Sequence, residues 1–401
     1  MAESFHLSVS VTSIQVTVCL VLLGVFSVIF GALSDTLSLK RLFLLGYVVL
    51  GIGSVVGFVF QSSFYGVVAG RLLQTVGQAS FGSLYLVLVS RYIDKDEKIK
   101  YYALFSGSFQ LAQIIGVFCG GFISTYIHWK ILFVIPLVVF LVLPLILKNL
   151  PEEEQKERGH IDVCGIGLLS ITILLIILSL DFKLPLLMAV AVIVGVGFFL
   201  YISKKKDAFI TIDFFKNPAY VWGIVAEFFV FSAQFAFPFI YSFVINGIYG
   251  KTLDMVSYVL LPGYCASAVV CLFFLTKIVK RFKNLGTLLI GAGTITAGLI
   301  LTALILPSGL IGLAIAGVIV MVGYAVVYSP MVDTIVGTLD EAHLGCGIGL
   351  NDMIINVSGS LGITVVSSLM SGIKLESYAT AMDAIAHYQW ILAGMAVAIF
   401  V

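Results

Sequence analysis

Long apolar stretches separated by short polar connectors dominate this chain of 401 residues. Each stretch is about 20 residues or more, the length with which a helix crosses the roughly 30 Å of hydrocarbon in a bilayer. A membrane β-strand would be about 10 residues long and would alternate apolar with polar positions, and these stretches do neither. The pattern therefore predicts an all-α polytopic membrane protein. The expected spans lie at about 9–33, 42–60, 64–90, 102–125, 131–147, 163–180, 184–203, 219–246, 255–276, 285–306, 309–331, 344–371 and 384–401.

Composition agrees with a bilayer as the solvent. Hydrophobic residues make up 60% of the chain and charged residues 11%, against about 25% charged residues in soluble domains. The net charge of +1 gives no field that would attract nucleic acid. The six cysteines show no CxxC spacing, so we expect small packing residues and neither a metal site nor a cofactor.

Basic residues gather in alternate connectors and set the expected orientation. Of the 22 Lys and Arg residues, 17 lie in the connectors that begin near 40, 91, 148, 204 and 277, whereas the connectors between them hold four. The positive-inside rule places the basic connectors in the cytoplasm. We therefore expect a multi-pass protein of the plasma (inner) membrane with its first residue outside.

The first basic connector reads Gly31-Ala-Leu-Ser-Asp35-Thr-Leu-Ser-Leu-Lys40-Arg41. A glycine at a helix end allows close packing, and an acid near a basic pair on a short loop can hold neighbouring helix ends together. Such a contact can break and re-form between two conformations, so Gly31, Asp35, Lys40 and Arg41 are candidate residues of a conformational latch. The alternative is an ordinary solvated turn.

The third expected span carries an arginine about 7 residues from its outer end. Arg71, Gln74 and Gly77 are spaced at i, i+3 and i+6, which would place them on one helix face. A guanidinium at this depth is costly unless it faces a partner or a water-filled cavity, so the three are candidate cavity residues. The alternative is that Arg71 extends to the lipid headgroups.

Four glycines lie on the fourth expected span, namely Gly107, Gly116, Gly120 and Gly121. Small residues at such spacing let two helices approach closely. A packing role and a hinge role are equally consistent with this pattern. Gln113, on the same span, is a further candidate cavity or coupling residue.

Two acids lie inside expected spans, Glu227 and Asp352, each about eight residues from the cytoplasmic end. Intramembrane acids are candidates for proton relay. Alternatively, each one bonds a local partner such as Gln234 or Asn351. We expect the acids at the interfaces to be solvated: Asp162, Asp213 and Asp333.

Three motifs on successive spans, GALSD…KR, R-x-x-Q-x-x-G and G-x-x-x-G-G, together resemble the major facilitator superfamily. Three further motifs make the chain similar to the fourteen-helix drug:proton antiporter branch, near the tetracycline-efflux exporters: His128-Trp129, Asp162-Val-Cys-Gly165 and Leu261-Pro262-Gly263. The chain has Val117 where the family's antiporter motif has proline, and Gly359 where tetracycline exporters carry glutamate.

The resemblance implies two six-helix bundles with two extra helices between them. It places an N-terminal bundle at 1–150, the extra helices at 151–215 and a C-terminal bundle at 216–401. On this alignment we expect the chain to lack the family's first helix and the end of its last. The resemblance also implies that the helices of Glu227 and Asp352 line a central cavity, where the two acids could share a proton.

The function that the sequence predicts is secondary transport, with proton-driven export of drugs or other amphipathic small molecules, and the resemblance adds tetracycline-like molecules as candidate substrates. The expected partners are such a substrate, protons and the lipid bilayer, and the expected state is a monomer. Crowded aromatics in the eighth span suit amphipathic ligands, although most of them are expected to pack or face lipid: Phe228, Phe229, Phe231, Phe235, Phe237 and Phe239.

Three alternatives stay open. The same fold could serve uptake of a small solute, or the shortened chain could be an inactive remnant. A membrane enzyme would need a positioned base or nucleophile, and neither HExxH nor GxSxG occurs in the chain; we therefore expect no enzyme. No G-x-x-x-x-G-K-[ST] loop for nucleotide occurs either.

Overall fold

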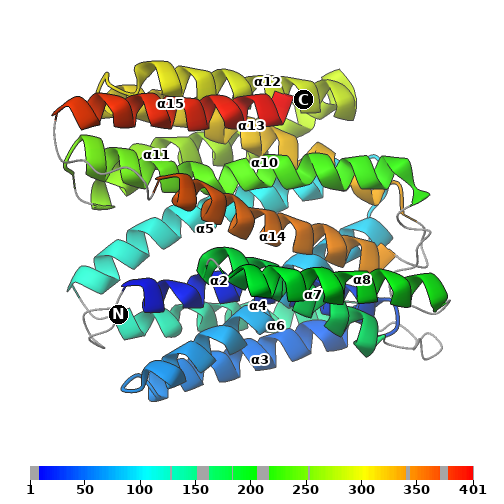
Figure 1. Cartoon of the computed structure of the whole chain (residues 1–401). Coiled ribbons are helices and arrows are strands. Elements are labelled where there is room, and N and C mark those ends of the chain that lie inside the picture. The colour runs from blue at the N-terminus through cyan, green and yellow to red at the C-terminus, as the bar shows by residue number, and fades with distance from the viewer. Residues whose placement is uncertain are drawn as a thin grey trace. The chain divides into compact units, whose positions relative to one another are not determined.

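The computed structural model describes residues 9–126, 129–150, 162–182, 184–205, 216–251, 253–339, 344–370 and 378–400. Within these ranges the chain is helical and contains no strand (Figure 1). The α-helices are α2 (Val9–Ser34), α3 (Leu39–Val59), α4 (Phe64–Tyr92), α5 (Lys98–Tyr126), α6 (Leu143–Asn149), α7 (Val163–Phe182), α8 (Pro185–Lys204), α10 (Pro218–Phe243), α11 (Leu253–Val269), α12 (Leu275–Ile305), α13 (Leu310–Val336), α14 (Leu344–Met370) and α15 (Tyr378–Phe400).

Four shorter segments have other helical geometries. The 3₁₀ segments are η1 (Trp129–Phe133) and η2 (Ile135–Leu141), and the π segments are η3 (Val244–Ile248) and η4 (Val270–Phe274). Eight segments of the described chain are long and apolar enough to cross a membrane. Shorter apolar helices occur at Val18–Ser34, Cys164–Ile176 and Tyr388–Ile399. The multi-pass architecture is confirmed, and the count of thirteen spans stays a prediction.

Three expected spans differ in detail from simple α-helices. The span at 131–147 consists of η1, η2 and the short α6. Prolines stand near the start of η2 and of α6, and a proline supplies no N–H for an α-helical hydrogen bond. The two expected spans at 255–276 and 285–306 form one apolar stretch, Met255–Ile305. Lys283, with φ 59°, interrupts the helical conformation inside α12.

The chain divides into two compact units. Unit 1 contains Met1–Tyr92, Phe122–Trp222 and Thr338–Ser360, and unit 2 contains Ile93–Gly121, Gly223–Gly337 and Leu361–Val401. The three-part division expected from the sequence stays a prediction.

In unit 1, α4 packs against α2 and α3, and α7 packs against α8. Glycines bring α3 and α4 together: a Cβ added at Gly77 would lie 2.5 Å from the Leu50 nitrogen, and one added at Gly53 would nearly overlap the backbone of Gln74. Bulk on either side would therefore push the two helices apart.

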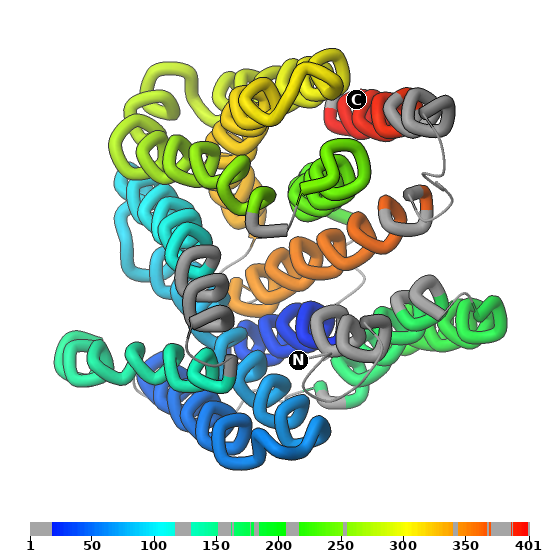
Figure 2. Tube along the Cα trace, turned by 90° about the vertical axis from the view of Figure 1, so that its left-hand side faces the viewer, coloured from blue at the N-terminus to red at the C-terminus, as the bar shows by residue number. Residues whose placement is uncertain are grey.

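In unit 2, α13 packs against α11 and α12, and α15 packs against α12 (Figure 2). Fully buried aliphatic side chains fill these interfaces, among them Ile295 and Leu299 of α12 and Val320 of α13. The two π segments interrupt regular helices in this unit, η3 after α10 and η4 after α11. Such segments occur frequently at functional sites.

Candidate functional site

The Asp35 cluster consists of Asp35, Ser34, Arg91 and the first amides of α14. It forms within unit 1, where α2 ends. Asp35 Oδ1 accepts a hydrogen bond from Arg91 Nη2 at 2.6 Å, and Arg91 Nη1 donates to the Ser34 carbonyl at 2.7 Å. The side chains of Arg91 and Asp35 are 13% and 16% exposed. The pair is therefore largely shielded from water, where charge-assisted hydrogen bonds are strongest.

The same carboxylate also binds the start of α14. The amides of Gly345 and Cys346 donate to Asp35 Oδ1 and Oδ2, each at 3.0 Å. The first amides of a helix have no intrahelical acceptor and carry the positive end of the helix dipole. Asp35 thus acts as an anionic cap on a helix about 310 residues further along the chain.

Glycines make this contact possible. Gly31 of α2 lies against Gly345 and Gly349 of α14, and a Cβ added at Gly31 would overlap the Gly345 carbonyl. A Cβ added at Gly345 would also lie 2.7 Å from Asp35 Oδ1. The expected close packing at Gly31 is present, and it brings the α14 amides within reach of the carboxylate.

The Asp35 cluster contains a basic residue, Arg91, that lies outside the GALSD…KR motif. Arg91, in the last turn of α4, forms an ion pair with Asp35. Lys40 is half-buried and Arg41 is exposed, and a latch role for these two stays a prediction. In the sequence, Arg91 was one of several basic residues at the cytoplasmic helix ends. Its position directly after the third expected span, which ends near residue 90, was the available signal.

The second candidate face, on α4, does not form as expected. Gln74 is buried, and its Nε2 donates to Ser54 Oγ at 2.9 Å and to the Phe133 carbonyl at 3.1 Å. Gly77 packs against α3, whereas Arg71 is exposed. Gln74 and Gly77 therefore serve packing inside unit 1, since their face of the helix is turned toward α3. A role for Arg71 or for the half-buried Gln113 stays a prediction.

The glycines of α5 divide into two groups. Gly107 packs against Leu272, whose Cδ2 would lie 2.7 Å from an added Cβ. Gly116 is exposed, and among the described residues an added Cβ there would meet nothing within 4 Å. The close helix approach expected at Gly116 is therefore absent from this part of the structure. The surroundings of Gly120 and Gly121 lie outside the described residues.

The two intramembrane acids belong to different units. Asp352 is in the part of α14 that belongs to unit 1, where the Ser27 hydroxyl of α2 bonds its carboxylate. Glu227 of α10 belongs to unit 2 and is fully buried. A shared proton between them stays a prediction.

Asn351, beside Asp352, is a polar residue that the sequence offered only as a partner for that acid. Its side chain is fully buried, and within the described residues its amide makes no hydrogen bond. A buried polar group normally has a partner, so Asn351 adds an unsatisfied amide next to a titratable acid. Its position next to Asp352 inside an apolar span was the signal in the sequence.

The interfacial acids are not simply solvated. Asp162 is 1% exposed. Its Oδ1 accepts from Tyr201 Oη at 2.5 Å, from Lys205 Nζ at 2.9 Å and from the Gly165 amide at 3.1 Å. The Tyr201 and Asp162 hydrogen bonds raise the pKa of Lys205 above its ordinary value, so the cation is held at the end of α8. The expectation of a solvated Asp162 is wrong, because α8 returns beside α7 and covers it.

Asp333 is half-buried and accepts a hydrogen bond from Asn284 Nδ2 at 2.8 Å. Asp213, His128 and His160 lie outside the described residues. No group of three or more His, Cys, Asp or Glu side chains that could hold a metal ion occurs in the described ranges.

Known proteins resemble this chain over its whole length. A family model described as Major Facilitator Superfamily matches residues 1–363. The quinolone resistance protein NorB of Staphylococcus aureus (strain bovine RF122 / ET3-1) is 24% identical over 418 residues, covering 100% of this chain and 88% of NorB. NorB of strain MSSA476 is 23% identical with the same coverage.

Solved structures share the fold. The human organic anion transporter MFSD10 (TETRAN) has a TM-score of 0.67 and 14% identity, and the match covers 97% of this chain and 82% of that one. The proton:xylose symporter XylE has a TM-score of 0.65 and 14% identity, with 98% and 86% covered.

Proposed function

This chain belongs to the major facilitator superfamily, and we propose that it exports amphipathic drugs, quinolones among them, in exchange for protons. As a member of that family it is a multi-pass secondary transporter of the plasma membrane that moves a small molecule. The export direction and the drug class are supported by similarity to the NorB proteins, which are named for quinolone resistance.

The contacts of the Asp35 cluster support a transport cycle with two conformations. One carboxylate joins the ends of α2 and α4 to the first amides of α14 through three hydrogen bonds. The two bonds to the Gly345 and Cys346 amides need one helix register, so a shift of α14 along α2 breaks both together and leaves the Asp35–Arg91 pair in place. A contact of this kind is strong in one conformation and absent in another, which is the requirement for a two-state switch.

We assign proton coupling to Glu227, with Asp352 as a second member. Glu227 is fully buried on α10, and a buried carboxylate is costly to hold as an anion. It therefore gains from binding a proton whenever it is closed off from water. Asp352 bonds Ser27 and lies in the same unit as the Asp35 cluster, so its protonation acts on the α2–α14 contact.

An efflux assay in a drug-pump-deficient bacterium tests export. Cells that express the chain should accumulate several-fold less norfloxacin than cells that express Asp35→Asn at equal abundance, and an uncoupler should abolish the difference. Higher accumulation in expressing cells would identify an uptake permease. Equal accumulation of norfloxacin and of a wider set of dyes in both strains would point to an inactive protein.

Substrate-induced proton release from everted vesicles tests the coupling. We expect Glu227→Gln to abolish proton release while drug binding stays within about twofold, because the amide keeps the shape of the acid but binds no proton. Asp352→Asn should lower release by the same amount or less, and the double variant should be no worse than the poorer single one. Normal proton release from the double variant would exclude both acids from coupling.

A further inference from the structure

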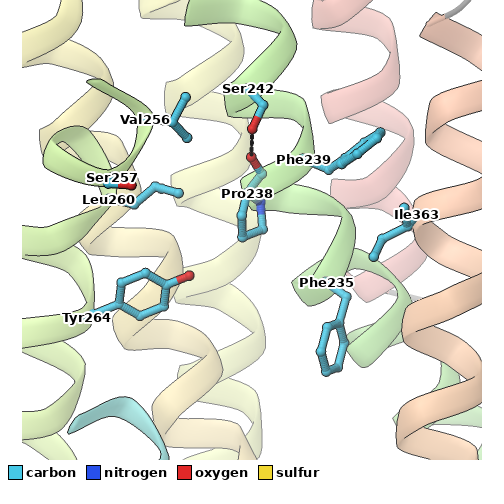
Figure 3. Close-up of a pocket in the computed structure, with 9 residues that line it drawn as sticks. All are labelled: Phe235, Pro238, Phe239, Ser242, Val256, Ser257, Leu260, Tyr264 and Ile363. Carbon is cyan, nitrogen blue, oxygen red and sulfur yellow. Dashed lines mark hydrogen bonds between the residues drawn. The ribbon is translucent and has the colours of Figure 1, made fainter. Parts of the chain in front are cut away.

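A cavity of about 280 Å³ lies within unit 2, between α10, α11 and α14 (Figure 3). Three aromatic side chains line it, two from α10 and Tyr264 from α11. None of the nine lining residues carries a charge, and these residues are Phe235, Pro238, Phe239, Ser242, Val256, Ser257, Leu260, Tyr264 and Ile363. The cavity is not part of the Asp35 cluster, which belongs to unit 1.

Prolines inside two helices shape this cavity. Pro238 stands inside α10 and Pro262 inside α11, and neither supplies an N–H to the carbonyl four residues earlier. Ser242 instead turns its hydroxyl back to the Pro238 carbonyl, at 3.1 Å. The π segment η3 begins directly after α10. Regular helix–helix packing is therefore interrupted on this stretch of α10, which leaves space beside it.

The polar groups of the cavity are hydroxyls. Figure 3 shows the Tyr264 side chain of α11 directed toward Pro238 on α10. In the part of the chain that the structure describes, the Tyr264 hydroxyl has no hydrogen-bond partner, although the residue is only half-exposed. A phenol hydroxyl in such a position usually finds a partner. Here a ligand can supply one, and Ser257 brings a second hydroxyl to the same cavity wall.

We propose that this cavity binds the uncharged aromatic ring system of the exported molecule, with Tyr264 and Ser257 hydrogen-bonding a polar substituent on the ring. The inference rests on the proposed export function and names the part of the substrate that unit 2 holds. Phe235, Phe239 and Tyr264 offer ring faces and edges to a planar ligand.

Size and charge narrow the ligand further. Ligand cavities usually measure about 300–1,000 Å³, so a cavity of about 280 Å³ takes a fused pair of rings and not a whole four-ring drug. A cation placed among these nine uncharged side chains would lose its hydration without gaining a counter-charge. The cavity therefore selects neutral rings over cationic ones of equal size.

Equilibrium binding to the purified full chain in detergent, without any ion gradient, tests the proposal. The probes are 1-naphthol and 1-naphthylmethylammonium, which share the ring pair and differ in charge. We expect 1-naphthol to bind at least tenfold more tightly than the ammonium. Tyr264→Phe should weaken 1-naphthol several-fold and leave naphthalene unchanged, because naphthalene has no hydroxyl to bond.

Substitutions that fill the cavity with a larger side chain test the proposed binding site most directly. Ser257→Phe should weaken 1-naphthol at least tenfold, whereas Cys265→Phe should change nothing, because Cys265 is an exposed residue of the same helix that does not line the cavity. Ile363→Phe fills the cavity from α14 and replaces Ser257→Phe if that variant is not monodisperse. Unchanged 1-naphthol binding in a folded cavity-filling variant, or displacement of 1-naphthol by decane but not by norfloxacin, would overturn the proposal.

These outcomes separate the cavity from the transport function. If Ser257→Phe weakens 1-naphthol binding but the wild-type chain exports no drug, the export proposal is wrong and the cavity is still a binding site. If Ser257→Phe exports norfloxacin and binds 1-naphthol normally, the export proposal stands and the cavity is not the site that binds the ring system.

Discussion

The two units each tie a connector to a nearby helix end through an aspartate, but the charges are arranged differently. In unit 1 the acid, Asp35, is in the connector after α2 and its cationic partner, Arg91, ends α4. In unit 2 the acid, Asp333, is near the end of α13 and its partner is a neutral amide, Asn284, just after the break at Lys283. The basic segment 277–283 contains no acid of its own, and the acid that bonds the neighbouring Asn284 is supplied by α13.

The difference shows which contact can act as a switch. Asp35 bonds a cation and two amides of α14, so that one side chain holds three chain segments. Asp333 and Thr334, both on α13, accept from the Asn284 amide at 2.8 and 3.3 Å. A hydrogen bond to a charged group contributes about 1.5–3 kcal/mol where it is shielded from water, as at Asp35, and less where water competes, as at the partly exposed Asn284. Asp35 is therefore suited to a conformational contact, and Asp333 to fastening a turn.

Neutralising the two aspartates should give the largest contrast. Asp35→Asn should lower the initial rate of norfloxacin efflux by at least about tenfold at equal membrane abundance, because the amide loses the charge that holds Arg91 and the α14 amides. Asp333→Asn should keep more than half of the rate. Efflux rates in cells matched by immunoblot provide the measurement. Equal efflux rates in Asp35→Asn and Asp333→Asn would show that the two aspartates do not differ in their importance for transport.

Exchanging the two charges of unit 1 should also abolish efflux. In the double variant Asp35→Arg, Arg91→Asp the ion pair can re-form, but a cation then faces the positive end of α14. If the pair alone mattered, the exchange would restore the efflux that each single variant loses. Restoration to more than half of the wild-type rate would show that the α14 amides contribute nothing.

A methyl group at the start of α14 should have an intermediate effect. Gly345→Ala places a Cβ against Gly31 and Asp35, so we expect a several-fold loss of efflux together with a lower melting temperature. Gly116→Ala is the matched control, because no described atom lies near its added Cβ, and it should leave both quantities unchanged. Thermal unfolding in detergent and efflux in cells would measure the pair.

The smallest effect is expected for the neutral contact of unit 2. Asn284→Ala removes hydrogen bonds to Asp333 and Thr334 at a partly exposed site, so the loss of stability should be about 1 kcal/mol or less. Efflux should stay within about twofold of wild type. A loss of efflux as deep as that of Asp35→Asn would show that unit 2 also contains a switching contact.

Much of the architecture could be predicted from local pattern. The apolar runs gave helices such as α3, α8 and α13, and the glycine of GALSD marked the close approach of α2 to another helix. Individual interactions were harder. Asp162 looked like a solvated interfacial acid, because nothing in its neighbourhood shows that Tyr201 and Lys205 return to cover it.

The sequence by itself determined that the chain crosses a bilayer repeatedly as helices. It also identified three acids as candidate functional residues: Asp35 by its motif, and Glu227 and Asp352 by their position inside apolar spans. These are local properties, since roughly 20 apolar residues must satisfy their own backbone in hydrocarbon. Only the tertiary structure decided what the acids touch. Asp35 meets Arg91 at a separation of 56 residues and the Gly345 amide at a separation of 310. Such pairings depend on which helices pack together. The hydropathy of a span shows that it crosses the bilayer but does not show which other spans lie beside it.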